Sequence, residues 1–181
     1  MQAHRLIPHP AHPPLAVTAI EARIHDDDAN WLRLRWKVEG AQKLVLPRIG
    51  SKTRADGLWR TTCFELFLQP EGGAGYSEWN LSPSRRWNAY DFVEYREGMA
   101  ERVVRRAPDS QVHPGSSFTI FYAAIPRSEL PDAPCRMSIS AVIEEEGGRI
   151  SYWAIQHPND EKPDFHDPAC FVAGLAAPHA S

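Results

Sequence analysis

Short runs in which apolar and polar residues alternate are the feature that most constrains the fold of this chain. The clearest run is WLRLRWKVEG at 31–40, where charged side chains occupy one face and apolar ones share the other: Leu32, Leu34, Trp36 and Val38. A period of two is typical of a strand with one buried and one exposed face. Residues 31–40 are therefore expected to form a half-buried antiparallel strand.

Comparable runs recur along the chain, separated by Gly, Pro and Ser turn signals. They are TCFELFL, YSEWNLS, WNAYDFVEY, SFTIFYAAIP, RMSISAVIEEE and RISYWAIQH. None shows a helical period over the length of an ordinary helix. About nine to eleven short strands with turns at regular spacing predict an all-β protein, an antiparallel β-sandwich of the immunoglobulin-like kind.

The length of 181 residues predicts one domain with a sizeable core. Residues 15–176 are assigned to this β-sandwich domain, residues 1–14 to an extended arm rich in proline, and residues 177–181 to a tail. Three cysteines lack metal-ligand spacing. Buried, reduced thiols are expected, with one disulfide as the alternative.

Composition argues against several classes of partner. The formal net charge is -3, which leaves no basic footprint for nucleic acid. No apolar run approaches the roughly 20 residues of a membrane-spanning helix, so no membrane partner is expected. The first residues contain four prolines and lack the continuous apolar stretch of a secretory signal, so a cytoplasmic location is expected.

Residues 57–99 concentrate the aromatic and charged side chains that could recognise a ligand. Trp59 follows a polar loop, and Glu65 lies in the middle of a strand, on the face opposite Phe64 and Leu66. A mid-strand carboxylate of this kind needs a partner, which is either a ligand or an arginine, Arg86 or Arg85.

A second polar face follows in the next strand. Tyr76, Glu78 and Asn80 alternate with Trp79 and Leu81, so they share one face. That face is either a concave binding surface or an ordinary solvent-exposed one. Sugar recognition suits these residue types, since an indole covers the apolar side of a pyranose and charged groups form strong hydrogen bonds to its hydroxyls.

Three segments carry a resemblance to a known family: LWRTTCFELFL, YSEWNLSPSRRWNAYDF and SYWAIQHPNDEKPDFHDPACF. The chain resembles the DOMON-like superfamily over residues 15–175. It is most similar to bacterial single-domain proteins related to family 9 carbohydrate-binding modules. The resemblance implies a jelly-roll-like sandwich of two antiparallel sheets with its ligand on a concave sheet or at the rim.

The resemblance also implies roles for individual residues. Trp59 and Glu65 match a tryptophan that stacks on the sugar and a glutamate six residues later that bonds its hydroxyls. Arg86 falls near a ligand-contacting arginine, with Arg85 as the alternative in register. The second aromatic wall of those modules has two candidates here, Trp153 and Phe165.

The sequence thus predicts a non-catalytic domain that binds a small ligand, a saccharide or sugar derivative, with no cofactor and no metal. The predicted site comprises Trp59, Glu65, Arg86, Arg85, Glu78, Asn80, Trp153 and Phe165. No nucleophile elbow, phosphate-binding loop or dinucleotide fingerprint points to catalysis. The alternatives are a protein-interaction module, a haem-binding protein and a glycan-processing enzyme.

Overall fold

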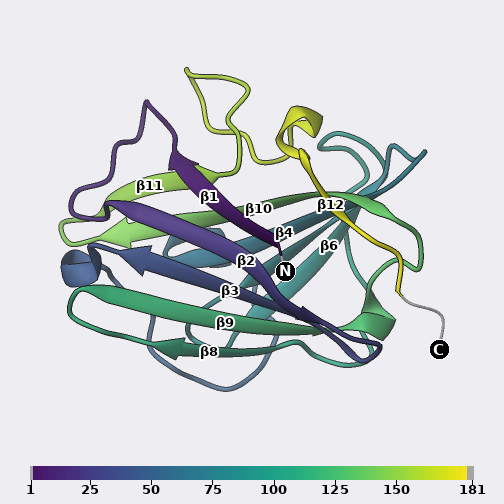
Figure 1. The fold of residues 1–181 in the computed structure, drawn as a ribbon, viewed down its shortest axis with the longest axis horizontal. Coiled ribbons are helices and arrows are strands. Elements are labelled where there is room, and N and C mark those ends of the chain that lie inside the picture. Colours follow the sequence, from purple (N-terminus) through teal and green to yellow (C-terminus); the bar gives the residue numbers. More distant parts are fainter. Residues whose placement is uncertain (1, 179–181) are drawn as a thin grey trace.

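The computed structural model describes residues 2–178, which form twelve strands paired in antiparallel fashion and four short 3-10 helices (Figure 1). The strands are β1 (Gln2–Pro8), β2 (Ala19–Asp27), β3 (Trp31–Glu39), β4 (Cys63–Pro70), β5 (Tyr76–Leu81), β6 (Trp87–Phe92), β7 (Ala100–Glu101), β8 (Asp109–His113), β9 (Phe118–Pro126), β10 (Cys135–Glu145), β11 (Arg149–Ala154) and β12 (Ala173–Leu175). The helices are η1 (Ala41–Lys43), η2 (Leu58–Arg60), η3 (Arg127–Glu129) and η4 (Pro168–Cys170). The all-β class predicted from the alternating runs is confirmed.

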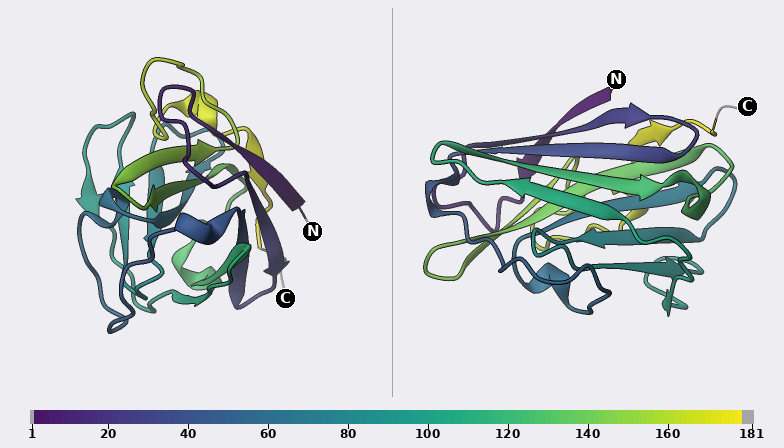
Figure 2. Two further views of the ribbon diagram at one scale, coloured as in Figure 1. Left: turned by 90° about the vertical axis from the view of Figure 1, so that its left-hand side faces the viewer. Right: turned by 90° about the horizontal axis from the view of Figure 1, so that it is seen from below.

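The strands form one strongly curled sheet rather than the two separate sheets expected. Its order is β7-β6-β5-β4-β10-β11-β1-β2-β3-β9-β8, and β12 pairs with β10. Strand β1 joins the two halves, because residues 2–6 pair with β2 and residues 7–8 pair with β11. Figure 2 shows the two halves facing each other. The prediction of an arm over residues 1–14 was wrong for residues 2–8, whose backbone hydrogen bonds are made inside the sheet.

The main core lies between the two halves. Alternation places Leu32, Leu34, Trp36 and Val38 of β3 in this core, as the sequence predicted. The opposite half contributes Phe64, Leu66 and Leu68 from β4. The ring of Phe64 stacks on that of Phe121, with centroids 4.4 Å apart and an angle of 14° between the ring planes.

A second apolar cluster lies on the other side of β4, β5 and β10, where an exposed face would be the ordinary outcome. The segment after β11 folds back over this face, and Phe171 packs against Phe67 and Tyr76 at 6.0 and 5.6 Å between ring centroids. Both faces of β4 are consequently buried. This covering segment creates the environment of the candidate site.

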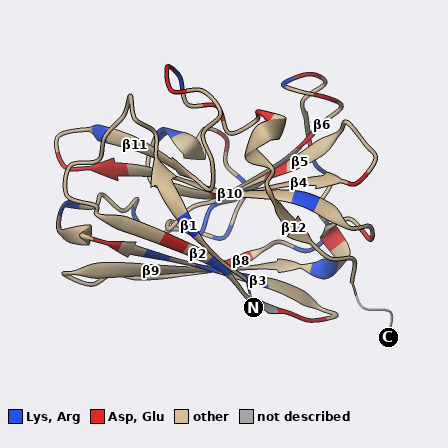
Figure 3. Ribbon diagram, turned by 45° about the horizontal axis from the view of Figure 1, so that its top comes forward, with Lys and Arg blue, Asp and Glu red and all other residues tan. Residues whose placement is uncertain are grey.

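Other expectations concern the whole chain. The three cysteines are buried and free, as predicted. Residues 179–181 of the predicted tail lie outside the described residues. In residues 2–178, no helix is long and apolar enough to cross a membrane. Acidic and basic positions are interspersed over the ribbon (Figure 3), so the acidity described below is local to one pocket.

Candidate functional site

A pocket of about 360 Å³ opens on the covered face of the sheet. Its floor comes from β4, β5 and β10, and its walls come from η2, the loop between β6 and β7, β11 and the segment after β11. The lining residues are Trp59, Glu65, Phe67, Glu78, Phe92, Arg96, Met99, Val142, Tyr152, Pro163, Phe165 and His166. The pocket therefore combines an aromatic wall with two carboxyl groups.

Trp59 forms the exposed edge of this pocket. Gly57 adopts φ 70°, a left-handed conformation that glycine reaches without a Cβ clash, and η2 begins directly after it. The indole remains 36% exposed and meets the ring of Tyr90 edge-on, with centroids 6.3 Å apart. The exposed part of the indole is available to a ligand.

Glu65 and Glu78 form the polar floor. Glu65 lies opposite Asn80 in the β4–β5 ladder, and Glu78 lies opposite Phe67, so the two carboxyl-bearing residues are diagonal neighbours on one face. Glu65 is 2% exposed and accepts a hydrogen bond from the Ser140 hydroxyl at 3.2 Å. Glu78 is 6% exposed and accepts one from the Asn80 amide at 2.9 Å.

Burial dominates the electrostatics of this floor. It raises the pKa of Glu65 well above the ordinary range, and the neighbouring Glu78 raises it further because two anions repel. Burial also raises the pKa of Glu78 to about 7, against the opposing effects of the Asn80 hydrogen bond and the Arg96 charge. Both shifts favour the protonated form of the pair relative to ordinary glutamates.

His166 lines the pocket from the segment after β11. The Tyr76 hydroxyl accepts the backbone N–H of Arg96 at 3.2 Å and lies 2.8 Å from His166 Nδ1. Burial, with the Arg96 charge adding to it, lowers the pKa of His166 to about 4, so its ring is neutral at pH 7. The other ring nitrogen, Nε2, lies 3.6 Å from a Glu78 oxygen.

Arg96 and Asp164 hold the two covering loops together. The Arg96 guanidinium lies 2.7 Å from Asp164 Oδ1, and the Tyr95 hydroxyl donates to the same carboxylate. Asp164 also accepts the backbone N–H of His166 at 3.1 Å. These contacts fix the loop between β6 and β7 against the segment after β11, and so determine where the pocket residues on these two segments lie.

Several predicted site residues meet in this pocket. Trp59, Glu65, Glu78 and Phe165 all line it. Asn80 is fully buried beside them and hydrogen-bonds Glu78. Of the two candidates for a second aromatic wall, the structure brings Phe165 to the pocket.

Three predicted residues lie elsewhere. Arg85 and Arg86 occupy the tight turn between β5 and β6, where both are exposed and Arg85 adopts φ 74°. Trp153 is buried in the core between the halves and donates its Nε1–H to Ser151 at 2.9 Å. The structure does not bring these three residues to the pocket, because a shift of one position along a strand exchanges its two faces and a turn residue projects beyond both.

Other lining residues were not predicted. Arg96 and His166 reach the pocket from loops, whose positions depend on long-range packing rather than on local alternation. The segment HPNDEKPDFHD at 157–167 offered one indication of such a loop. Its prolines and aspartates are typical of a fixed loop, and Phe165 gives that loop an apolar side. It indicates a covering loop without locating what it covers.

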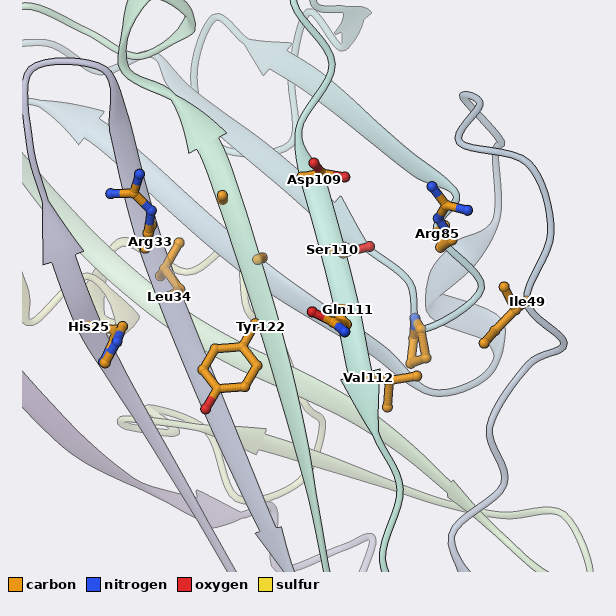
Figure 4. A pocket seen from close by; sticks show the side chains of 13 residues that line it. His25, Arg33, Leu34, Ile49, Arg85, Asp109, Ser110, Gln111, Val112 and Tyr122 are labelled. Atoms are coloured by element: carbon orange, nitrogen blue, oxygen red, sulfur yellow. The ribbon is translucent and has the colours of Figure 1, made fainter.

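A larger hollow of about 540 Å³ lies beside the edge strand β8 (Figure 4). Figure 4 shows Arg85 and Ile49 on loops next to β8, with Tyr122, Arg33 and His25 farther across the sheet. Its acid, Asp109, is largely exposed and lies 3.1 Å from Lys52. No buried carboxyl lines this hollow, so the smaller pocket is the stronger candidate for specific recognition.

The described residues do not form a candidate metal centre. Within residues 2–178, no group of three or more His, Cys, Asp or Glu side chains is arranged to hold a metal ion. The polar groups of the pocket are hydrogen-bond acceptors and donors of the kind that bind an organic ligand.

Comparison with known proteins gives a likeness of fold. No protein-family model and no curated protein matches the sequence. A candidate carbohydrate-binding protein from Bacteroides uniformis superposes with a TM-score of 0.62 and 17% identity, covering 94% of this chain and 84% of that one. A family 9 carbohydrate-binding module from Caldicellulosiruptor kristjanssonii, in complex with glucose, gives 0.53 and 11%, covering 97% and 85%. The predicted similarity to family 9 modules is thus confirmed for the fold.

Proposed function

We propose that the pocket binds a saccharide, with the Trp59 indole against the ring and Glu65 accepting hydrogen bonds from hydroxyls. The observation that carries this proposal is the joint presence of an exposed indole and a buried carboxyl in one pocket. A pyranose needs both, because it has an apolar C–H face and a polar rim.

The size and composition of the pocket support the proposal. A volume of about 360 Å³ lies at the lower end of the range for small-molecule pockets, which suits a single sugar ring. Phe165 and Tyr152 supply further apolar surface on the walls. The similar structure that was solved with glucose adds support from outside this chain.

The arrangement of the acids favours binding over hydrolysis. A glycosidase places its two carboxyl groups on opposite sides of the scissile bond. Here Glu65 and Glu78 are diagonal neighbours on the same face of the floor. They can contact one side of a ligand together, so the proposed function is non-catalytic.

Tryptophan fluorescence tests the proposal. Titration with a panel of monosaccharides and disaccharides should change the emission of the wild-type protein, and Trp59→Ala should abolish the change. Trp31→Ala is the matched control, because Trp31 lies on β3 beneath the Arg106 guanidinium, away from the pocket residues. A panel without any response, or a response that persists in Trp59→Ala, would refute the proposal.

A further inference from the structure

We propose that the pocket selects a saccharide that carries a protonated amine, that is, an amino sugar. This inference rests on the proposed saccharide function and adds the chemical group that the ligand presents to the floor. It is carried by the excess of hydrogen-bond acceptors around Glu65 and Glu78, and by the aromatic side chains that surround them.

The floor offers acceptors that nothing in the described protein fully satisfies. Glu65 and Glu78 each accept one side-chain hydrogen bond, from Ser140 and Asn80. A carboxylate can accept more than one hydrogen bond, so the floor favours a ligand group rich in donors. An ammonium group has three donors and no acceptor.

Within the protein, the charge of the floor is offset only in part, by the nearby Arg96 guanidinium. Among the described residues, no Lys or Arg forms an ion pair with Glu65 or Glu78. Arg96 lines the pocket, but its guanidinium is engaged by Asp164. A cation brought by the ligand would supply the missing partner, and pairing is what makes a buried carboxylate tolerable.

The walls suit a cation as well. Five aromatic residues line this one small pocket: Trp59, Phe67, Phe92, Tyr152 and Phe165. The face of an aromatic ring attracts a cation, most strongly when both are shielded from water. Aromatic rings around a pair of acids therefore favour an ammonium over a neutral hydroxyl at the same position.

The groups that face Glu78 set the pH dependence. They are Glu65 from β4, Asn80 and Tyr76 from β5, His166 from the segment after β11 and Arg96 from the loop between β6 and β7. His166 stays neutral above its lowered pKa of about 4, so it adds no competing charge at neutral pH. The raised pKa of Glu78, about 7, means that affinity for an ammonium should increase from pH 5.5 to pH 7.5.

The test compares matched ligands by isothermal titration calorimetry at pH 7.5. Glucosamine and galactosamine carry the charge, glucose and galactose replace the amine by a hydroxyl, and the N-acetyl sugars keep the nitrogen without its charge. Choline supplies a cation without a sugar ring. One of the amines should bind at least about tenfold more tightly than its neutral counterparts and choline, the expected size of a charge-assisted hydrogen bond.

Variants connect the preference to the floor. Glu78→Gln preserves shape and removes the carboxylate charge, so it should reduce the amine preference about tenfold while neutral sugars lose less. Arg86→Ala, in the exposed turn, should leave the preference unchanged. Circular dichroism and the total tryptophan emission of each variant establish that it is folded.

The outcomes separate this inference from the proposed function. Neutral sugars that bind as tightly as amino sugars would overturn the amine preference and leave saccharide binding intact. Equal binding of choline would overturn the need for a sugar ring. Failure of every sugar to bind would overturn both proposals.

Discussion

Buried carboxyl groups control the behaviour of this protein at the scale of single residues. Burial raises the pKa of Glu78 to about 7, which means that the folded state holds a proton more tightly than the unfolded chain does. The stabilisation from this bound proton is fully present below the unfolded value of about 4.5 and is lost as pH rises through about 7. His166 acts in the opposite sense, because its pKa is lowered and the unfolded chain binds the proton first.

The first prediction concerns Glu78→Gln, which removes this titration and leaves His166 in place. Between pH 5 and pH 8, the wild-type free energy of unfolding should fall relative to that of the variant by on the order of 2 kcal/mol. Urea denaturation across this pH range measures the difference. A constant difference between the two proteins would show that Glu78 titrates normally. Glu71→Gln, an exposed position on the turn after β4, serves as the control.

Residue-level prediction anticipated which side chains the structure brings together where the family resemblance and strand alternation agreed. The resemblance paired Trp59 with Glu65, and both line the pocket. Phe165 was one of two candidates for the second aromatic wall. Arg86 and Trp153 show the limit of such prediction. The position of Arg86 depends on the turn between two strands, and the face on which Trp153 lies depends on the register of the whole sheet.

At the scale of elements, the loop between β1 and β2 is held by a single buried carboxylate. Glu145, at the end of β10, is fully buried and accepts the backbone N–H groups of Leu15, Ala16 and Val17 at 2.6, 2.7 and 3.0 Å. Hydrogen bonds to a charged acceptor are stronger than neutral ones. This carboxylate fixes the chain between the strand that joins the two halves and β2.

The second prediction follows from these three hydrogen bonds. Glu145→Gln puts an amide NH₂ against backbone donors and should lower the free energy of unfolding by about 3 kcal/mol. Glu146→Gln, at the exposed neighbouring position, should change it by less than about 0.5 kcal/mol. Equal effects in urea denaturation would mean that Glu145 does not anchor the loop.

The segment after β11 is the element that turns an outer sheet face into a pocket. Its Phe171 is 1% exposed and packs on β4 and β5. Phe171→Ala should cost about 3 to 5 kcal/mol of stability, as deletion of a buried phenyl ring does. It should also weaken saccharide binding, because the segment that carries His166 and Phe165 loses one of its contacts with β4 and β5. A stable variant with unchanged affinity, measured by calorimetry, would contradict this role.

For the whole molecule, local patterns predicted the class of fold better than its connectivity. Alternation identified most strands, such as β3, because apolar and polar residues alternate along a strand that buries only one face. The joining role of β1 could not be read from residues 2–8, since four prolines in the first fourteen residues mask the pattern. The burial of Glu65 together with Phe64 required the covering segment, a contact some 100 residues away in sequence.

The central claim, that a saccharide binds between Trp59 and the floor of β4 and β5, is tested most directly by NMR mapping. A ¹⁵N-labelled sample titrated with glucose and glucosamine reports every backbone amide and all six indole N–H groups. Shifts should concentrate on the Trp59 indole and on residues 63–67, 76–80 and 163–166. Shifts confined to β8 and Tyr122 beside the larger hollow, or no shifts with either sugar, would contradict the account.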